Sequence, residues 1–89
     1  MKEQKIEWEI PLDCLDRLAR SKHVKELMMK VSPQVGYLTV TIITHERVRI
    51  PIEGYIQENG AWQAVVTSPA TDNWSISDTL TFLATAIRE

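Results

Sequence analysis

The sequence is short of the residues that disulfides, phosphate loops and membrane spans require. Its 89 residues include one cysteine, Cys14, and three glycines. A single cysteine excludes a disulfide within the chain and favours a reducing compartment, so we expect a cytoplasmic protein. No apolar run approaches the ~20 residues of a membrane-spanning helix, and the start MKEQKIEWE does not read as a secretory signal. The glycines are scattered and form no phosphate-binding loop.

Motifs for catalysis and metal binding are also absent. Cys14, His23 and His45 have suitable chemistry, but they show no C-x-x-C, H-x-x-x-H or H-E-x-x-H spacing. Glu7 and Glu9 alternate with apolar residues, as solvated residues on the outer face of a strand do. We therefore expect a protein that is not an enzyme, with no catalytic, cofactor-binding or metal-binding residues and no small-molecule substrate.

Charge is unevenly distributed along the chain. The net charge is −2, which is not typical of a nucleic-acid-binding protein. Segment 13–30 nevertheless has five basic residues against three acidic ones, whereas segment 58–89 has one against four. The basic segment is interpreted either as a solvated helix face or as part of a nucleic-acid site. That alternative site comprises Arg17, Arg20, Lys22, Lys25, Arg47 and Arg49.

The strongest local signal is segment 35–68, which predicts three consecutive antiparallel strands. Aliphatic residues alternate with threonine over 38–42 and mainly with charged residues over 47–53, and the third run places Trp62, Ala64 and Val66 on one face. Pro51 has no N–H to donate to a ladder. Its strand is therefore predicted to lie at an edge or to direct that amide position outward.

The register of the last two strands depends on their turn. Asn59-Gly60 predicts a two-residue type I′ turn. With that turn alone, Val66 would lie opposite the charged residue Glu53. We predict one extra residue, a bulge at Gly54, which brings Ile52 opposite Val66. The predicted inner face then consists of Ile50, Ile52, Tyr55, Trp62, Ala64 and Val66, and it leaves Ile43, Ile56 and Val65 on the outer face.

The N-terminal third predicts a strand and then helical structure. Strict alternation over 5–10 predicts a strand that ends at Pro11, and Asp13 is a candidate N-cap for the helix that follows. Segment 12–31 carries two apolar stripes that lie about half a turn apart on a helical wheel. We expect either two short helices, the second capped by Ser21, or one helix between the sheet and a partner subunit.

The C-terminal segment predicts one amphipathic helix. Its apolar residues recur at i, i+4, i+7 and i+11 from Ile76 to Ile87. Ser75 and Asp78 have the spacing of an acidic capping box, and segment 68–73 is expected to be the preceding loop.

These elements predict a single α+β domain over 1–89. We expect a two-layer sandwich with a three- to four-stranded antiparallel sheet, helices on one face, and the order β-α(α)-β-β-β-α. The order resembles, in topology, the double-stranded-RNA-binding domain and the ribosome hibernation factor domain. Both resemblances imply RNA or ribosome binding. The chain departs from the first family at 73–78, NWSISD, where that family has lysines, and from the second in its negative net charge.

Apolar residues in excess of what one core needs suggest a function. The predicted protein interface comprises Trp74, Ile43, Tyr55, Ile56, Val65, Met28 and Met29. We expect a small protein-interaction module, such as an inhibitor, immunity protein, adaptor or homodimeric accessory protein of bacterial or phage type. Its partner is expected to be another protein or a second copy of itself, and not a membrane. Binding of RNA or of the ribosome is the alternative.

Overall fold

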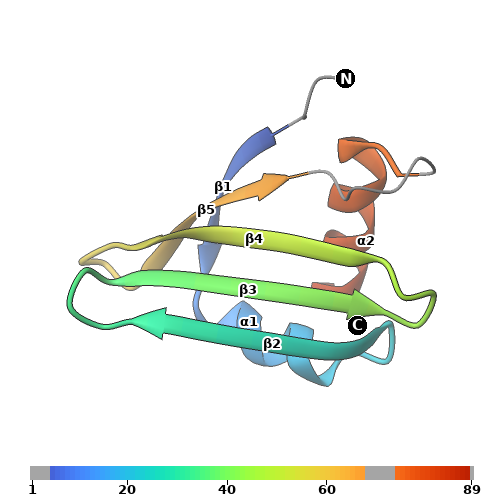
Figure 1. Ribbon diagram of the computed structural model, residues 1–89, viewed down its shortest axis with the longest axis horizontal. Coiled ribbons are helices and arrows are strands. Elements are labelled where there is room, and N and C mark those ends of the chain that lie inside the picture. The colour runs from blue at the N-terminus through green and yellow to red at the C-terminus, as the bar shows by residue number, and fades with distance from the viewer. Residues whose placement is uncertain (1–4, 68–73, 89) are drawn as a thin grey trace.

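The computed structural model describes residues 5–67 and 74–88, and Figure 1 shows their arrangement. The predicted loop over 68–73 lies outside the described residues. The elements in chain order are β1 (Lys5–Pro11), α1 (Asp13–Arg20), β2 (Val24–Ser32), β3 (Tyr37–Thr44), β4 (Arg49–Ile56), β5 (Ala61–Thr67) and α2 (Ile76–Arg88).

The strands form one antiparallel sheet of five strands in the order β1-β5-β4-β3-β2. The α+β class is confirmed, and so are β1, the three strands within 35–68 and the C-terminal helix. The predicted strand count and element order are wrong, because the chain follows β-α-β-β-β-β-α. The topological resemblance to the two RNA-binding groups rested on the predicted order, and the observed order does not support it.

The main error of the sequence-based prediction concerns β2. The sequence predicts helical structure over 12–31, but residues 24–32 form a strand that pairs with β3. The two apolar stripes that did not fit one helix are explained by a change of structure at Ser21, which is the C-cap of α1 and not the N-cap of a second helix. The Ser21 side chain accepts a hydrogen bond from the His23 N–H at 3.2 Å, and so stabilises the turn into β2.

The helix ends agree with the sequence more closely at α2 than at α1. Asp13 is the first residue of α1 and not its cap, because Leu12 occupies the cap position without a side-chain hydrogen bond. At α2, the Ser75 N–H donates to the Asp78 carboxylate at 3.0 Å, and the Asp78 N–H donates to the Ser75 hydroxyl at 3.2 Å. This reciprocal pair confirms the predicted capping box.

The β4–β5 turn differs from the prediction by one residue. The Gly60 N–H donates to the Gln57 carbonyl at 3.0 Å, and Gly60 itself has a positive φ of 85°. The turn therefore has three residues, as in hairpins that end on a glycine in the left-handed region. Ile52 does lie opposite Val66, but through the turn and not through a bulge at Gly54. As a consequence Ile56, opposite Trp62, faces inward, and Tyr55 faces outward.

Gly54 is required by the close approach of β4 and β5. It lies opposite Ala64 on the inner face, and an added Cβ would collide with the Gln63 carbonyl oxygen and lie 2.8 Å from the Ala64 Cα. Pro51 lies in the middle strand of the sheet, which the sequence left open. The β4–β5 ladder ends at Ile52, one residue short of Pro51. The missing N–H of Pro51 therefore interrupts no hydrogen bond of that ladder.

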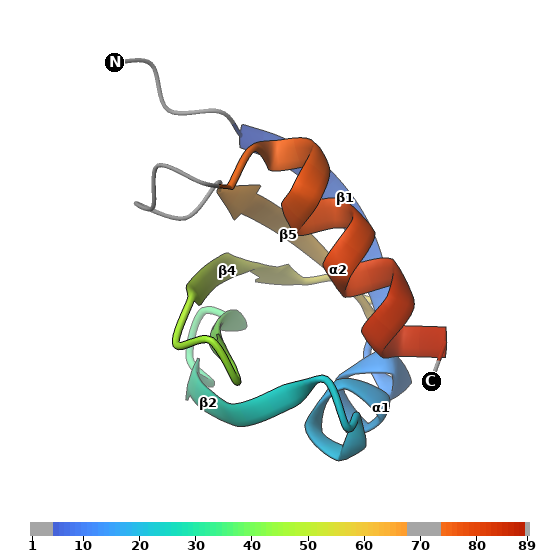
Figure 2. The same cartoon turned by 90° about the vertical axis from the view of Figure 1, so that its right-hand side faces the viewer.

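The core lies between the concave face of the sheet and the two helices, which Figure 2 shows on the same side. Helix α1 buries Leu15 and Leu18, and α2 buries Thr79, Leu83 and Ala86. Trp62 on β5 is completely buried, and its indole N–H has no hydrogen-bond partner among the described residues. Its burial is therefore stabilised by apolar contact.

The connection between β1 and β2 requires the sheet to curl. These strands are the two edges, and on a flat sheet the diagonal from Pro11 to Val24 would be about 35 Å. Helix α1 spans about 11 Å between its first and last Cα atoms, and the extended steps that join it to Pro11 and Val24 add at most about 22 Å, which is still short of this diagonal. The sheet twist, about 20–25° per strand pair, brings the edges within reach, and Figures 1 and 2 show the resulting curvature.

The Gly54 contact yields a stability prediction. We expect Gly54→Ala to lower the free energy of unfolding by at least about 3 kcal/mol, because the added methyl group meets backbone that cannot move without separating two strands. Gly60→Ala is the matched control, since nothing lies within 4 Å of its added Cβ and only the positive φ opposes it. It should cost about 1–2 kcal/mol. Urea denaturation measures both, and equal stability of Gly54→Ala and the wild type would contradict the register.

Candidate protein-interaction surface

The inner face of β2 carries apolar side chains that the helices do not cover. Leu27, Met29 and Val31 lie opposite Ile42, Val40 and Leu38 of β3, and we call these three β2 residues the β2 apolar row. Directly opposed residues point to the same face of a sheet, so the row continues the core.

Exposure along the two strands shows where the core ends. The three β3 partners are at most 3% exposed, whereas Met29 is 53% exposed and Val31 is 51% exposed. The side chain of Leu27 is half-buried. The row is therefore a part of the core face left open to solvent.

The position of the helices explains this exposure. Helix α1 packs near the start of β2, where Val24 is buried. Figure 1 shows the β2–β3 turn at one end of the sheet and α2 behind the opposite end. Val35, in that turn, is 63% exposed. Met29 and Val31 thus lie toward the end of the sheet that is farther from α2, next to the turn that exposes Val35.

The outer face of the sheet also exposes apolar residues, but charges separate them. Ile43 lies between Glu26 of β2 and Arg49 of β4, and Val65 lies between Glu53 and Glu7. Met28 and Tyr55 are about half exposed on the same face. Of the residues predicted for an interface, Ile43, Tyr55, Val65 and Met28 therefore share the outer face, whereas Met29 and Ile56 face inward.

Two tyrosines form a pair on the outer face. The rings of Tyr37 and Tyr55 meet edge to face, with centroids 4.8 Å apart. The pKa of the Tyr37 phenol is raised above 10.0, first because desolvation disfavours the charged form and then because of the charge and hydrogen bond of Glu53. Both causes favour the neutral form of the Tyr37 phenol.

Trp74 packs within its own segment. Its ring meets that of Phe82 on α2 edge to face, with centroids 5.8 Å apart, and both side chains are partly buried against the core. Trp74 is one of the residues predicted for the interface, and this contact packs part of its ring against α2.

The predicted basic residues come from two segments that meet at one end of the molecule. His45, in the β3–β4 turn, makes a 2.8 Å hydrogen bond through Nε2 with the Lys22 carbonyl, in the α1–β2 turn. Arg47 and Arg49 follow on one side of this contact, and Lys25 follows on the other. The fold therefore brings together basic residues that lie more than 20 positions apart.

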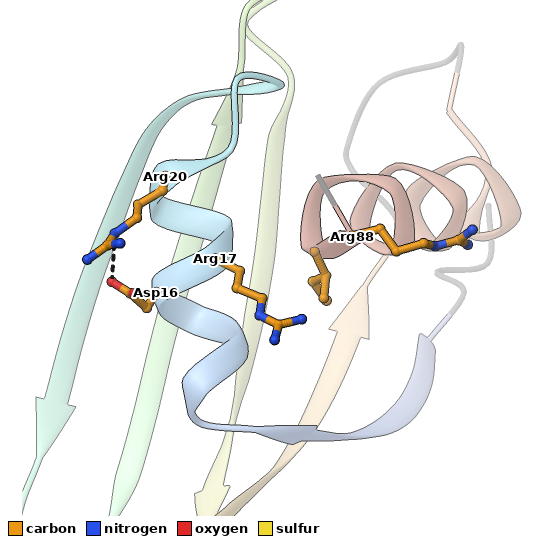
Figure 3. Close-up of a pocket in the computed structure, with 5 residues that line it drawn as sticks. Asp16, Arg17, Arg20 and Arg88 are labelled. Atoms are coloured by element: carbon orange, nitrogen blue, oxygen red, sulfur yellow. Dashed lines mark ion pairs between the residues drawn. The ribbon is translucent and has the colours of Figure 1, made fainter.

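The helices add a shallow hollow beside this basic end. Its volume is about 400 Å³, and Figure 3 shows the side chains around it. Arg20 forms an ion pair with Asp16 at 3.3 Å, and both side chains are largely exposed. Arg17 extends toward the space between the helices, whereas Arg88 extends away from it. Arg17 is thus directed into the hollow, whereas the guanidinium group of Arg20 is already paired with Asp16.

The residues considered for catalysis do not assemble into a site. Cys14 lies half-buried on α1, and His45 is engaged with the Lys22 carbonyl. Within residues 5–67 and 74–88, no group of three or more His, Cys, Asp or Glu side chains is placed to hold a metal ion. Neither of the helices described is long and apolar enough to span a bilayer.

Sequence reasoning identified Met28 and Met29 as surplus apolar residues but missed the row to which Met29 belongs. Leu27, Met28 and Val31 belong to the second apolar stripe of the helical structure predicted over 12–31. The signal that could have found the row is the period-2 spacing of Leu27, Met29 and Val31, which helical spacing of the same residues obscures.

Comparisons with known proteins add no relative to these observations. No protein-family model matches the chain, and neither the curated proteins nor the solved structures include a significant match.

The tyrosine pair yields a prediction about pH. In a Tyr55→Phe background, ultraviolet titration of the remaining tyrosine should give a pKa above 10.0, and adding Glu53→Gln should lower it. Because the folded pKa lies above the unfolded one, the stabilisation is fully present below about pH 10 and is lost as pH rises through the folded pKa. A Tyr37 pKa at or below 10.0 would contradict the placement of Glu53 beside it.

Proposed function

We propose that the chain is a non-catalytic protein-binding module whose partner covers the β2 apolar row. The observation that supports this is the half exposure of Met29 and Val31 on the face that elsewhere forms the core. Covering the exposed part of these side chains would contribute about 1 kcal/mol each. Such a stripe beside a free strand edge suits a partner that adds a strand to the sheet.

The edge of β2 supports this mode of binding. Among the described strands β2 has a neighbour on one side only, so its other side presents backbone N–H and C=O groups. An added strand would pair with these groups, and its inward side chains would lie on the β2 apolar row. Inhibitors, immunity proteins, adaptors and homodimeric accessory proteins of bacteria or phages are the classes we propose. The single cysteine favours a cytoplasmic location.

Affinity capture from the source cells tests this function. The bait carrying Met29→Lys and Val31→Lys should lose a protein that the wild-type bait retains, because a charge replaces each side chain that the partner buries. Thr81→Lys, at an exposed position of α2, is the matched control and should retain it. If no captured protein depends on the β2 apolar row, the proposed function is wrong.

Nucleic-acid binding is a second candidate, which the contact between His45 and the Lys22 carbonyl favours. This contact holds the α1–β2 turn, which contains Lys22, beside the β3–β4 turn, which leads to Arg47 and Arg49. The candidate is weaker, because Arg20 is already paired with Asp16 and the net charge of the chain is −2. A partner bound here would be recognised through phosphates, without base contacts.

Fluorescence anisotropy with a labelled RNA duplex tests this second candidate. Six phosphate contacts predict an affinity that falls about a thousandfold between about 50 and about 200 mM salt. The double variant Arg47→Ala and Arg49→Ala should weaken binding and reduce the salt slope, whereas Lys5→Ala, on the far edge strand, should leave both unchanged. No binding at the lower salt concentration would dismiss the candidate.

A further inference from the structure

The free edge of β2 is complementary to itself. In a symmetric dimer that joins two sheets edge to edge, the strands run antiparallel and each residue i faces residue j of the second copy, with i + j constant. The two-fold axis is then perpendicular to the sheet, so the inner faces of the two copies lie on the same side of the joined sheet. Opposed residues must therefore have the same parity, and each allowed register is centred on one residue.

Centring the pair on Met28 matches both faces of the strand. On the outer face, Glu26 lies opposite Lys30 of the second copy, and the symmetry repeats this pair. On the inner face, Leu27 lies opposite Met29 of the second copy, also twice. The segment Glu26–Lys30, ELMMK, thus meets its own reverse with opposite charges and apolar residues aligned.

The neighbouring registers are less complementary. Centring on Leu27 sets Glu26 opposite Met28 of the second copy. Centring on Met29 aligns the inner-face residues, because Leu27 then faces Val31, but it sets Lys30 opposite Met28. Opposite charges on directly opposed residues stabilise a strand pair, and a charge that faces methionine gives no such stabilisation. The Met28-centred register is the one that satisfies the charges and the apolar residues together.

The remaining pairs of this register are compatible with it. Val31 faces Lys25 of the second copy, whose aliphatic stem can lie along the valine while its ammonium group stays in water. Lys25 also lies at the irregularity between Val24 and Glu26, where the regular ladder with β3 begins. The other edge strand, β1, is less suited to this mode, because the register that pairs Lys5 with Glu9 of the second copy sets Glu7 opposite Glu7, and because the strand ends at Pro11.

We propose that two copies of the chain form a homodimer through antiparallel pairing of their β2 strands, centred on Met28, which joins the two sheets into one. This inference rests on the proposed protein-binding function and identifies the partner as a second copy. The two β2 apolar rows become continuous at the junction, and each covers part of the other.

Exchange of charges tests the dimer. Sedimentation equilibrium should give twice the chain mass of 10.2 kDa. Glu26→Lys or Lys30→Glu alone should weaken the dimer at least about tenfold, because each creates two repulsive pairs. The double variant Glu26→Lys with Lys30→Glu should restore it. Both sites are exposed, and circular dichroism checks that each variant is folded. A chain that stays monomeric, or a double variant that is no better than the singles, overturns the proposal.

Disulfide trapping tests the register directly. In a Cys14→Ser background, Met28→Cys places two thiols on opposed residues with Cα atoms about 4.5–5.5 Å apart, within the range of a disulfide. Met29→Cys is the matched control, because in this register its Cα atoms are about 8 Å apart. Mild oxidation should cross-link the first variant and not the second. Cross-linking of the Met29 variant alone overturns the Met28-centred pairing.

If the chain is monomeric but capture still depends on Met29 and Val31, the dimer is excluded and the protein-binding function stands with a different partner.

Discussion

The short connection from β1 to β2 is the constraint on which the rest of the structure depends. It joins the two edges of a five-stranded sheet through a helix of eight residues. Because that helix is too short to cross a flat sheet diagonally, the sheet must curl around it, and the core forms inside the curl. Leu15 and Leu18 hold α1 in this position, since both are buried against the sheet and α2.

The same constraint determines which part of the sheet stays open. Helix α1 delivers the chain to the first residues of β2, and α2 lies behind the same end of the sheet, so nothing in the described chain covers the second half of β2. The exposure of Met29 and Val31 therefore follows from helix length and strand order, and not from a weak hydrophobic pattern. A longer α1 could have covered both residues. The proposed strand pairing uses the surface that this arrangement leaves exposed.

Local patterns in the sequence predicted most of the elements but not the strand order. Alternation identified β1, β3, β4 and β5, and the Ser75–Asp78 capping box identified the start of α2. For β2 the spacing of Leu27, Met28 and Val31 suits a helix as well as a strand, and pairing with β3 decides between them. The β4–β5 register was one residue off at the turn, because Asn-Gly suits both two- and three-residue loops. That residue reversed the faces assigned to Tyr55 and Ile56, so the candidate surface was predicted in part only.

Hydrogen exchange of the β2 amides, measured by NMR at several protein concentrations, tests most directly that β2 is an edge strand able to pair. In dilute solution alternate amides of 24–32 should be protected, because one side of the strand bonds to β3 and the other faces water. At high concentration the remaining amides should become protected as well. Protection of consecutive amides at every concentration, as a helix gives, would contradict the strand assignment, and an alternating pattern that never changes would contradict the pairing.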